Sequence, residues 1–105
     1  MKVAITSTGN SPDSKLDSRF GRCSYFVIFD TVTRGMEILP NPYQEAEEGA
    51  GTDSVKLLAS KGAGKIVSGE FGIKIKPLLD SLKIQLIILK NEEKSVQDII
   101  NMLNN

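Results

Sequence analysis

The chain has 105 residues with 13 basic and 13 acidic side chains, no histidine and one cysteine. Its length predicts one domain over residues 1–105, and the balanced charge argues against nucleic acid as a partner. Because the chain has no histidine, Ser-His-Asp and Cys-His catalysis are excluded. Because it has only one cysteine, an internal disulfide is excluded, as is a zinc or iron–sulfur site made by one chain alone.

A membrane or secretory role is also not expected. No apolar stretch approaches the ~20 residues that cross a bilayer, and the start of the chain resembles a short strand more than a secretory signal. We therefore expect a cytoplasmic protein. Any metal would be held by oxygen ligands, by subunits that share Cys23, or as part of a preassembled cofactor.

The first half of the chain predicts three strands and two long loops. Residues 2–7 are rich in β-forming residues, and the runs at 24–30 and 35–40 are separated by a short turn typical of a hairpin. The run at 24–30 is apolar at successive positions, so we expect a central strand. Residues 8–23 and 40–51 are rich in Gly, Pro, Ser and Asp, which predicts mobile loops.

A helix and a strand are expected next. Thr52 and Asp53 are both plausible N-caps, and Gly62 is a natural stop for the helix. Residues 65–69 then predict a short strand.

The last third predicts another helix, a buried strand at 84–89 and a final helix. Pro77 is compatible with the first of these helices only in its first turn. Ser95 and Asp98 have the spacing of a capping box for the last helix. The alternation of helix and strand from residue 52 onward implies parallel pairing. Together with the hairpin, it predicts a mixed α/β sheet of five strands with flanking helices.

The stretch "DSRFGRC" (17–23) contains the only cysteine and two arginines. Nearby cations would lower the pKa of the Cys23 thiol and favour the thiolate, which binds metals and acts as a nucleophile. Arg19, Gly21 and Arg22 could also form an anion site. In the alternative interpretation, Cys23 is a small buried hydrophobe and the arginines lie on a solvated loop, paired with Asp13 or Asp17.

Two glycine-rich segments stand before predicted helices. They are "GAG" (49–51) and "SGEFG" (68–72), and helix N-termini attract anions. Neither matches a P-loop or a dinucleotide-binding motif, so ordinary tight turns are the alternative. Both lie where a strand or loop meets a helix, the place where open α/β sheets bind ligands.

The blocks "RFGRC" followed by "YF", "GAG" and "EFG" together resemble the dinitrogenase iron–molybdenum cofactor biosynthesis domain family, over nearly the whole chain. The resemblance implies a ribonuclease H-like three-layer fold with strand order 3-2-1-4-5. It also implies that the loops bind the iron–molybdenum cofactor or its iron–sulfur precursor. Nitrogenase-linked members typically carry histidine where this chain has Arg19, which leaves Cys23 as the only soft metal ligand, with Arg19 and Arg22 as counter-ions.

The resemblance therefore implies a set of cofactor-binding residues with Cys23 as the metal ligand. They are Arg19, Phe20, Gly21, Arg22, Cys23, Gly49, Gly51, Gly69, Phe71 and Gly72.

The sequence leaves three functions open. The first is a non-catalytic carrier of an iron–sulfur or iron–molybdenum type cofactor or its precursor, with a cluster donor or acceptor protein as partner. The second is a small regulatory or interaction domain that binds a small anion or a partner protein through the same loops. The third is a metal-dependent phosphodiesterase, for which Asp17, Asp30, Asp53 and Glu70 would have to assemble a two-metal site.

Overall fold

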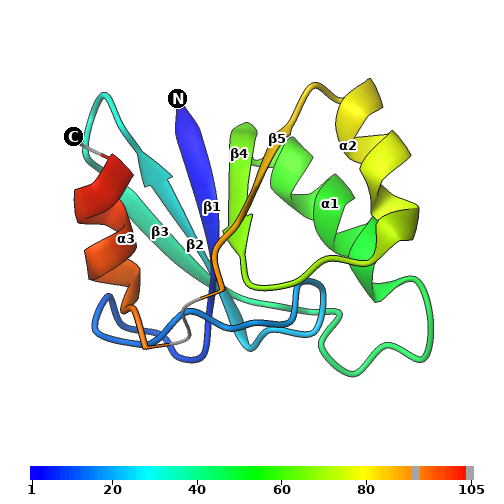
Figure 1. Cartoon of the computed structure of the whole chain (residues 1–105), viewed down its shortest axis with the longest axis horizontal. Coiled ribbons are helices and arrows are strands. Elements are labelled where there is room, and N and C mark those ends of the chain that lie inside the picture. Colours follow the sequence, from blue (N-terminus) through cyan, green and yellow to red (C-terminus); the bar gives the residue numbers. More distant parts are fainter. Residues whose placement is uncertain (91–92, 104–105) are drawn as a thin grey trace.

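The computed structural model describes residues 1–90 and 93–103. Five strands form one sheet with flanking helices (Figure 1). The elements in chain order are β1 (Lys2–Ser7), β2 (Tyr25–Asp30), β3 (Met36–Pro40), α1 (Ala50–Ser60), β4 (Ala63–Ser68), the 3₁₀ turn η1 (Ile73–Ile75), α2 (Lys76–Ser81), β5 (Gln85–Ile88) and α3 (Val96–Leu103).

The strand order is β3-β2-β1-β4-β5, as predicted. β2 runs antiparallel to β1 and β3, whereas β1, β4 and β5 are parallel. The mixed sheet of the α/β class is thereby confirmed, while the likeness to ribonuclease H stays a prediction. No helix among the described residues is long and apolar enough to cross a membrane.

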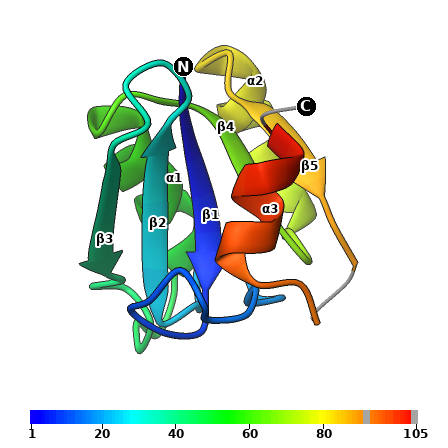
Figure 2. The same cartoon turned by 90° about the vertical axis from the view of Figure 1, so that its left-hand side faces the viewer.

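Helices cover both faces of the sheet. α1 and α2 lie on one face and α3 on the other (Figures 1 and 2). Phe26 of β2 packs in the cluster with α1 and α2, and the next residue, Val27, packs in the cluster with α3. This alternation explains why β2 is apolar at successive positions, since both of its faces are buried, and its interior place in the sheet confirms the prediction.

Two local predictions are wrong. α1 begins at Ala50, after Gly49 in the left-handed conformation (φ 78°) and without a side-chain cap, so neither Thr52 nor Asp53 is the N-cap. The glycine turns the chain into the helix before those residues are reached. β5 is an edge strand of four residues whose side chains are exposed or half-buried, so the fully buried strand expected at 84–89 is not observed.

The helix signals near the C-terminus are confirmed. The backbone N–H of Ser95 donates to Asp98 Oδ2 (3.1 Å), and the Asp98 N–H donates to Ser95 Oγ (3.0 Å). The hydrogen bond from the Ser95 N–H lowers the pKa of the Asp98 carboxyl. Pro77 lies in the first turn of α2, where its missing N–H costs no helical hydrogen bond.

The loop at 8–23 is fastened to the end of the sheet. Leu16 N donates to Lys94 O (2.9 Å), Asp17 N donates to Thr6 O (3.0 Å), and both side chains are buried. We therefore expect slow hydrogen exchange at the Leu16 and Asp17 amides and fast exchange at the exposed Asn10. Equally fast exchange at all of these amides would contradict this and would show that the loop is mobile, as its composition predicts.

Candidate functional site

Three loops meet at the end of the sheet where β1 and β4 terminate (Figure 1). They are residues 17–23, residues 41–49 and residues 69–72. Arg19 forms an isolated β-bridge with Glu70, and Phe20 N donates to Glu70 O (3.4 Å). Segments far apart in the sequence thus join at the carboxyl ends of parallel strands, where ligand sites form in this class of sheet.

Two of the predicted glycines permit this close approach. A Cβ on Gly21 (φ 88°) would lie 3.0 Å from both Cα and N of Gly51, and a Cβ on Gly69 would lie 2.6 Å from Ser18 Cα. A real Cβ essentially never approaches backbone to 2.6 Å, and at Gly21 the tight contact is joined by a positive φ that strains any side chain. Gly21 and Gly69 therefore permit the close packing of the loops, and their assignment as cofactor-binding residues stays a prediction.

Phe20 and Phe71 form the aromatic part of the site. Their rings stack with centroids 5.0 Å apart and an interplanar angle of 26°. Phe20 also lies against Phe26 of β2, with centroids 6.2 Å apart. Because Phe26 is fully buried, the sheet holds the half-buried aromatic pair in place.

Arg19 is the exposed cation of the site. Its Nε and Nη2 each lie 3.3 Å from one carboxylate oxygen of Asp17, and its backbone N–H also donates to Asp17 Oδ1 (2.9 Å). The side chain of Asp17 is 5% exposed and that of Arg19 is 57% exposed. The hydrogen bond to Asp17 raises the pKa of Arg19. The guanidinium is therefore held in one orientation while much of its surface remains open to an anion.

Arg22 contacts backbone carbonyl groups of a neighbouring loop. Its Nη1 donates to the backbone carbonyls of Gln44 (3.2 Å) and Ala46, and the residue is half-buried. The guanidinium thus ties the loop at 41–49 to the loop at 17–23. Arg22 is therefore not a solvated side chain, because its Nη1 is engaged by two carbonyl groups, and its role as a counter-ion stays a prediction.

The hydrogen bonds of Arg22 between the two loops predict that its removal lowers the stability of the fold. Arg22→Ala should lower the free energy of unfolding by about 1–2 kcal/mol, because two hydrogen bonds from a charged donor are lost. Arg22→Lys should recover part of it, because both bonds come from the single nitrogen Nη1 and an ammonium group also carries several N–H donors. The exposed Lys56 is the control, and its alanine variant should stay within about 0.5 kcal/mol of the wild type in denaturant melts. Equal melts for the two alanine variants would refute this role.

Asn41 is a site residue that the sequence analysis did not single out. It is 7% exposed, and its Nδ2 donates to the carbonyls of Gly21 and Cys23, both at 2.9 Å. Its Oδ1 accepts the Tyr43 N–H (2.9 Å). An asparagine followed by proline signals a turn, but nothing in that pattern shows that the side chain bridges two loops.

Cys23 is fully buried beneath these loops. Asn41 Nδ2 lies 3.8 Å from its Sγ. Burial raises the pKa of the thiol to about 12, and the charge of Asp17 adds to the rise. The expected lowering by the arginines is therefore wrong, because Arg19 and Arg22 turn to other partners and the thiol faces the interior.

The loops cover Cys23, the soft metal ligand that the sequence suggests. Cys23 reaches a metal only if the loops above it open. Within residues 1–90 and 93–103, no group of three or more His, Cys, Asp or Glu side chains could hold a metal ion. The binding that this surface supports in its observed form rests on charge and shape.

Two hollows adjoin each other on this surface. We call the smaller, about 220 Å³, the Arg19 pocket; it is lined by Arg19, Phe20, Glu70, Phe71 and Gly72. We call the larger, about 450 Å³, the Ile73 pocket; it is lined by Gly49, Gly51, Thr52, Gly72, Ile73, Lys74 and Ile75. Gly72 lines both.

The two pockets account for six of the ten predicted site residues. Those six are Arg19, Phe20, Gly49, Gly51, Phe71 and Gly72. The other four lie in the packing beneath or beside the pockets: Gly21, Arg22, Cys23 and Gly69.

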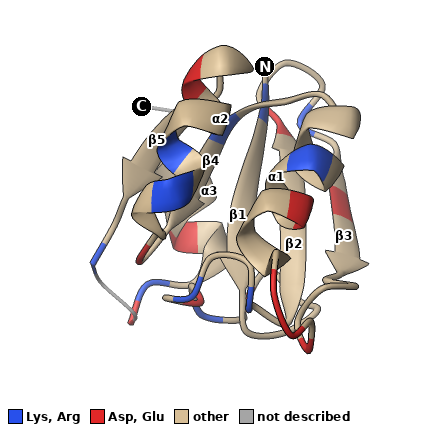
Figure 3. Cartoon of the chain, turned by 90° about the vertical axis from the view of Figure 1, so that its right-hand side faces the viewer, with Lys and Arg blue, Asp and Glu red and all other residues tan. Residues whose placement is uncertain are grey.

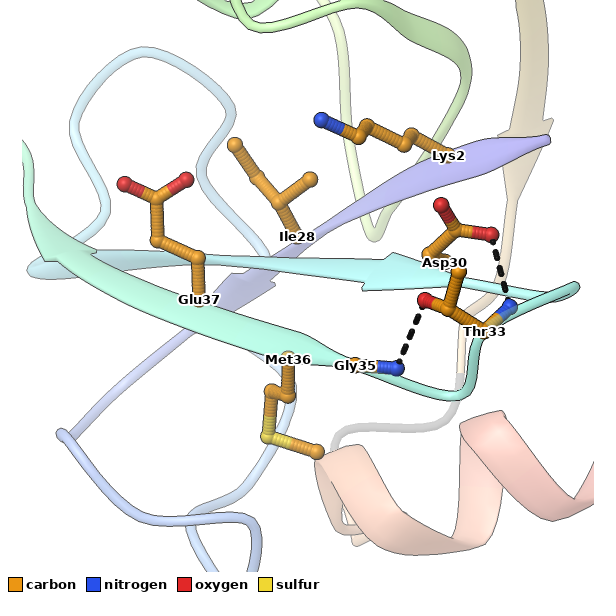
Figure 4. A pocket seen from close by; sticks show the side chains of 7 residues that line it. All are labelled: Lys2, Ile28, Asp30, Thr33, Gly35, Met36 and Glu37. Carbon is orange, nitrogen blue, oxygen red and sulfur yellow. Dashed lines mark hydrogen bonds between the residues drawn. The ribbon is translucent and has the colours of Figure 1, made fainter.

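A third hollow, of about 290 Å³, lies at the opposite end of β2, beside the turn into β3 (Figure 4). Asp30, which lines it, accepts hydrogen bonds from the backbone N–H groups of Val32 (2.8 Å) and Thr33 (3.2 Å). These bonds lower the pKa of Asp30 and stabilise the turn. Because Asp30 lies far along the sheet from Asp17 and Glu70, the four acids do not assemble the two-metal site that a phosphodiesterase requires.

The sequence matches the family described as "Dinitrogenase iron-molybdenum cofactor" over residues 1–105. The apo form of the orange protein from Desulfovibrio gigas is similar in structure, with a TM-score of 0.89 and 30% identity, covering 97% of this chain and 85% of that one. An NMR structure from Thermotoga, described as a candidate NifB protein, has a TM-score of 0.81 and 28% identity, with coverages of 97% and 85%. A search of curated proteins gave no match.

Proposed function

Because the chain belongs to the dinitrogenase iron–molybdenum cofactor family, we propose that it is a non-catalytic protein that binds and carries a metal–sulfur cofactor or its precursor. The single observation that supports this proposal most strongly is the Arg19 pocket, which joins a fixed, exposed cation to a stacked pair of phenylalanines. A donor or acceptor protein for the cargo is part of the proposal.

The charge of the pocket suits an anionic cargo. Iron–sulfur and molybdenum–sulfur clusters carry sulfide and thiolate ligands and are commonly anions. Arg19 is oriented by the buried Asp17, so little side-chain entropy is lost when it pairs with a ligand. Glu70 lines the same pocket, which weakens the attraction for a highly charged anion and favours a binder that can release its cargo.

The aromatic wall suits a soft cargo. Phe20 and Phe71 present half-buried rings, and sulfur makes favourable contacts with aromatic rings. An oxyanion of the same charge gains less from such a surface, because it is more strongly hydrated. The pocket thus favours sulfur over oxygen at the periphery of the ligand.

Release of the cargo is also consistent with the buried thiol. A neutral, inaccessible Cys23 forms no bond to metal while the loops are closed. If opening of the loops exposes it, a single thiolate can add one bond. In either case the protein supplies few ligands, as a carrier requires.

Binding of a simple oxyanion, or of a partner protein, through the same loops is the second candidate. Exposure of Arg19 is the observation that supports it. Equilibrium dialysis under anaerobic conditions with tetrathiomolybdate and with molybdate distinguishes the two candidates, because the two dianions differ in sulfur and oxygen alone. We expect retention of the thio-anion only, and equal retention of both would favour the oxyanion binder.

Variants then assign the site. Arg19→Ala should weaken retention of tetrathiomolybdate about tenfold, as expected for loss of a charge-assisted contact. Lys56→Ala, which alters an exposed lysine on α1, should not change it. Retention lost in Cys23→Ser but normal in Arg19→Ala would instead show that the thiol becomes a metal ligand. Absence of retention by the wild type, for this anion and for clusters from loaded donor proteins, would refute the carrier function.

A further inference from the structure

Ile73 is the most exposed large apolar side chain, at 87%, among the residues that the structure describes. Single exposed apolar residues are common on protein surfaces. Ile73 differs because it lines the largest of the hollows described above, together with the buried Ile75 and three glycines that leave backbone uncovered. The exposed side chain of Ile73 thus stands beside the apolar hollow of the Ile73 pocket, on the same face of the molecule.

The two sides of the Ile73 pocket carry opposite charges. On one side Lys74 follows Ile73 at the start of α2. On the other side the exposed Glu45, Glu47 and Glu48 lead to Gly49 at the pocket's edge. In Figure 3 the segment before α1 is red, whereas the first turns of η1 and α2 carry blue. Within the described residues, none of these four side chains takes part in an ion pair at 4.0 Å or less.

From this arrangement we infer that two copies of the chain pair through the Ile73 pocket about a twofold axis. In a twofold interface the same patch meets itself after rotation. An axis that passes midway between Ile73 and the hollow of the pocket brings Ile73 of each copy to the hollow of its partner. Because Lys74 lies on the side of Ile73 and the glutamates lie beyond the hollow, the same axis places the lysine side of each copy against the acidic side of the other. No second kind of molecule is required, because the patch is complementary to itself.

The inferred pairing goes beyond the proposed carriage of a cofactor and does not depend on it. It concerns the protein without cargo. Gly72 lines both pockets, so the contact borders the Arg19 pocket. Pairing would therefore shield one edge of that shallow pocket.

Sedimentation velocity of the full chain without cargo, over a series of concentrations, tests the inference. We expect a reversible monomer–dimer equilibrium that weakens as salt rises, since the facing charges are screened. Ile73→Asp should lower the association constant about tenfold or more. Val32→Asp is the matched control, because Val32 is also exposed (79%) but lies in the β2–β3 turn, and its association should equal that of the wild type.

Charge reversal gives an independent readout. Lys74→Glu alone, and Glu47→Lys with Glu48→Lys, should each abolish association, because like charges then face each other. An equimolar mixture of these two variants should associate again, since each restores the opposite charge for the other. Monomers at every concentration of the wild type, association insensitive to Ile73→Asp, or failure of the mixture to associate would each overturn the proposed interface.

Discussion

Replacing Phe26 with alanine should lower the free energy of unfolding by about 3–5 kcal/mol, the loss expected for a large buried aromatic side chain. Phe26 is fully buried between β2 and the helices α1 and α2. Its removal leaves a cavity at the centre of that layer. It also removes the ring that supports Phe20 beneath the aromatic pair.

Urea melts monitored by circular dichroism measure this loss. Val32→Ala is the control, because Val32 lies exposed in the β2–β3 turn, and its melt should move by less than about 0.5 kcal/mol. A loss for Phe26→Ala as small as that of the control would mean that this layer of the core is not packed as described.

Raising the pH from about 9 to about 12 should destabilise the protein through Cys23, with a slope approaching about 1.4 kcal/mol per pH unit from this group. Burial raises the pKa of the folded thiol to about 12 from an ordinary value of 9.0. Between these values the unfolded chain releases a proton that the folded chain retains. The unfolded state is therefore favoured as pH rises, and the group has no effect on stability below its unfolded pKa.

The comparison with Cys23→Ala isolates the thiol, because the two proteins differ at this side chain alone. The variant should start less stable at neutral pH, because it leaves a small cavity, and should lose less stability between pH 9 and 12 than the wild type. Parallel pH profiles for the two proteins would show that the thiol is already ionised or exposed in the folded state.

The sheet was predictable because its signals are local. The alternation of helix and strand after residue 52 and the apolar run of β2 follow from which faces each element must bury. For β5 only the predicted burial is wrong, since the strand order 3-2-1-4-5 already places it at the edge of the sheet. The run "IQLIIL" (84–89) is as apolar as a central strand, and its composition alone does not show that an edge strand leaves its side chains exposed or half-buried.

The site was predictable by position but not by role. The glycines and aromatics of the loops mark where the loops meet. The direction of each side chain depends on contacts distant in sequence: Arg22 reaches carbonyls 22 and 24 residues away, and Asn41 reaches back to Gly21 and Cys23. Such partners leave no local pattern. The sequence therefore suggested two free cations beside a reactive thiol, whereas in the structure Arg19 is exposed but paired with Asp17, Arg22 binds carbonyl groups and the thiol is buried.

NMR titration of the labelled protein with tetrathiomolybdate under anaerobic conditions shows whether cargo binds at the Arg19 pocket. We expect the amide signals of Arg19, Phe20, Phe71 and Gly72 to shift together and saturably, while those of the β2–β3 turn at 31–35 do not move. Shifts confined to the β2–β3 turn, or no saturable shift at the four pocket residues, would contradict binding at this pocket.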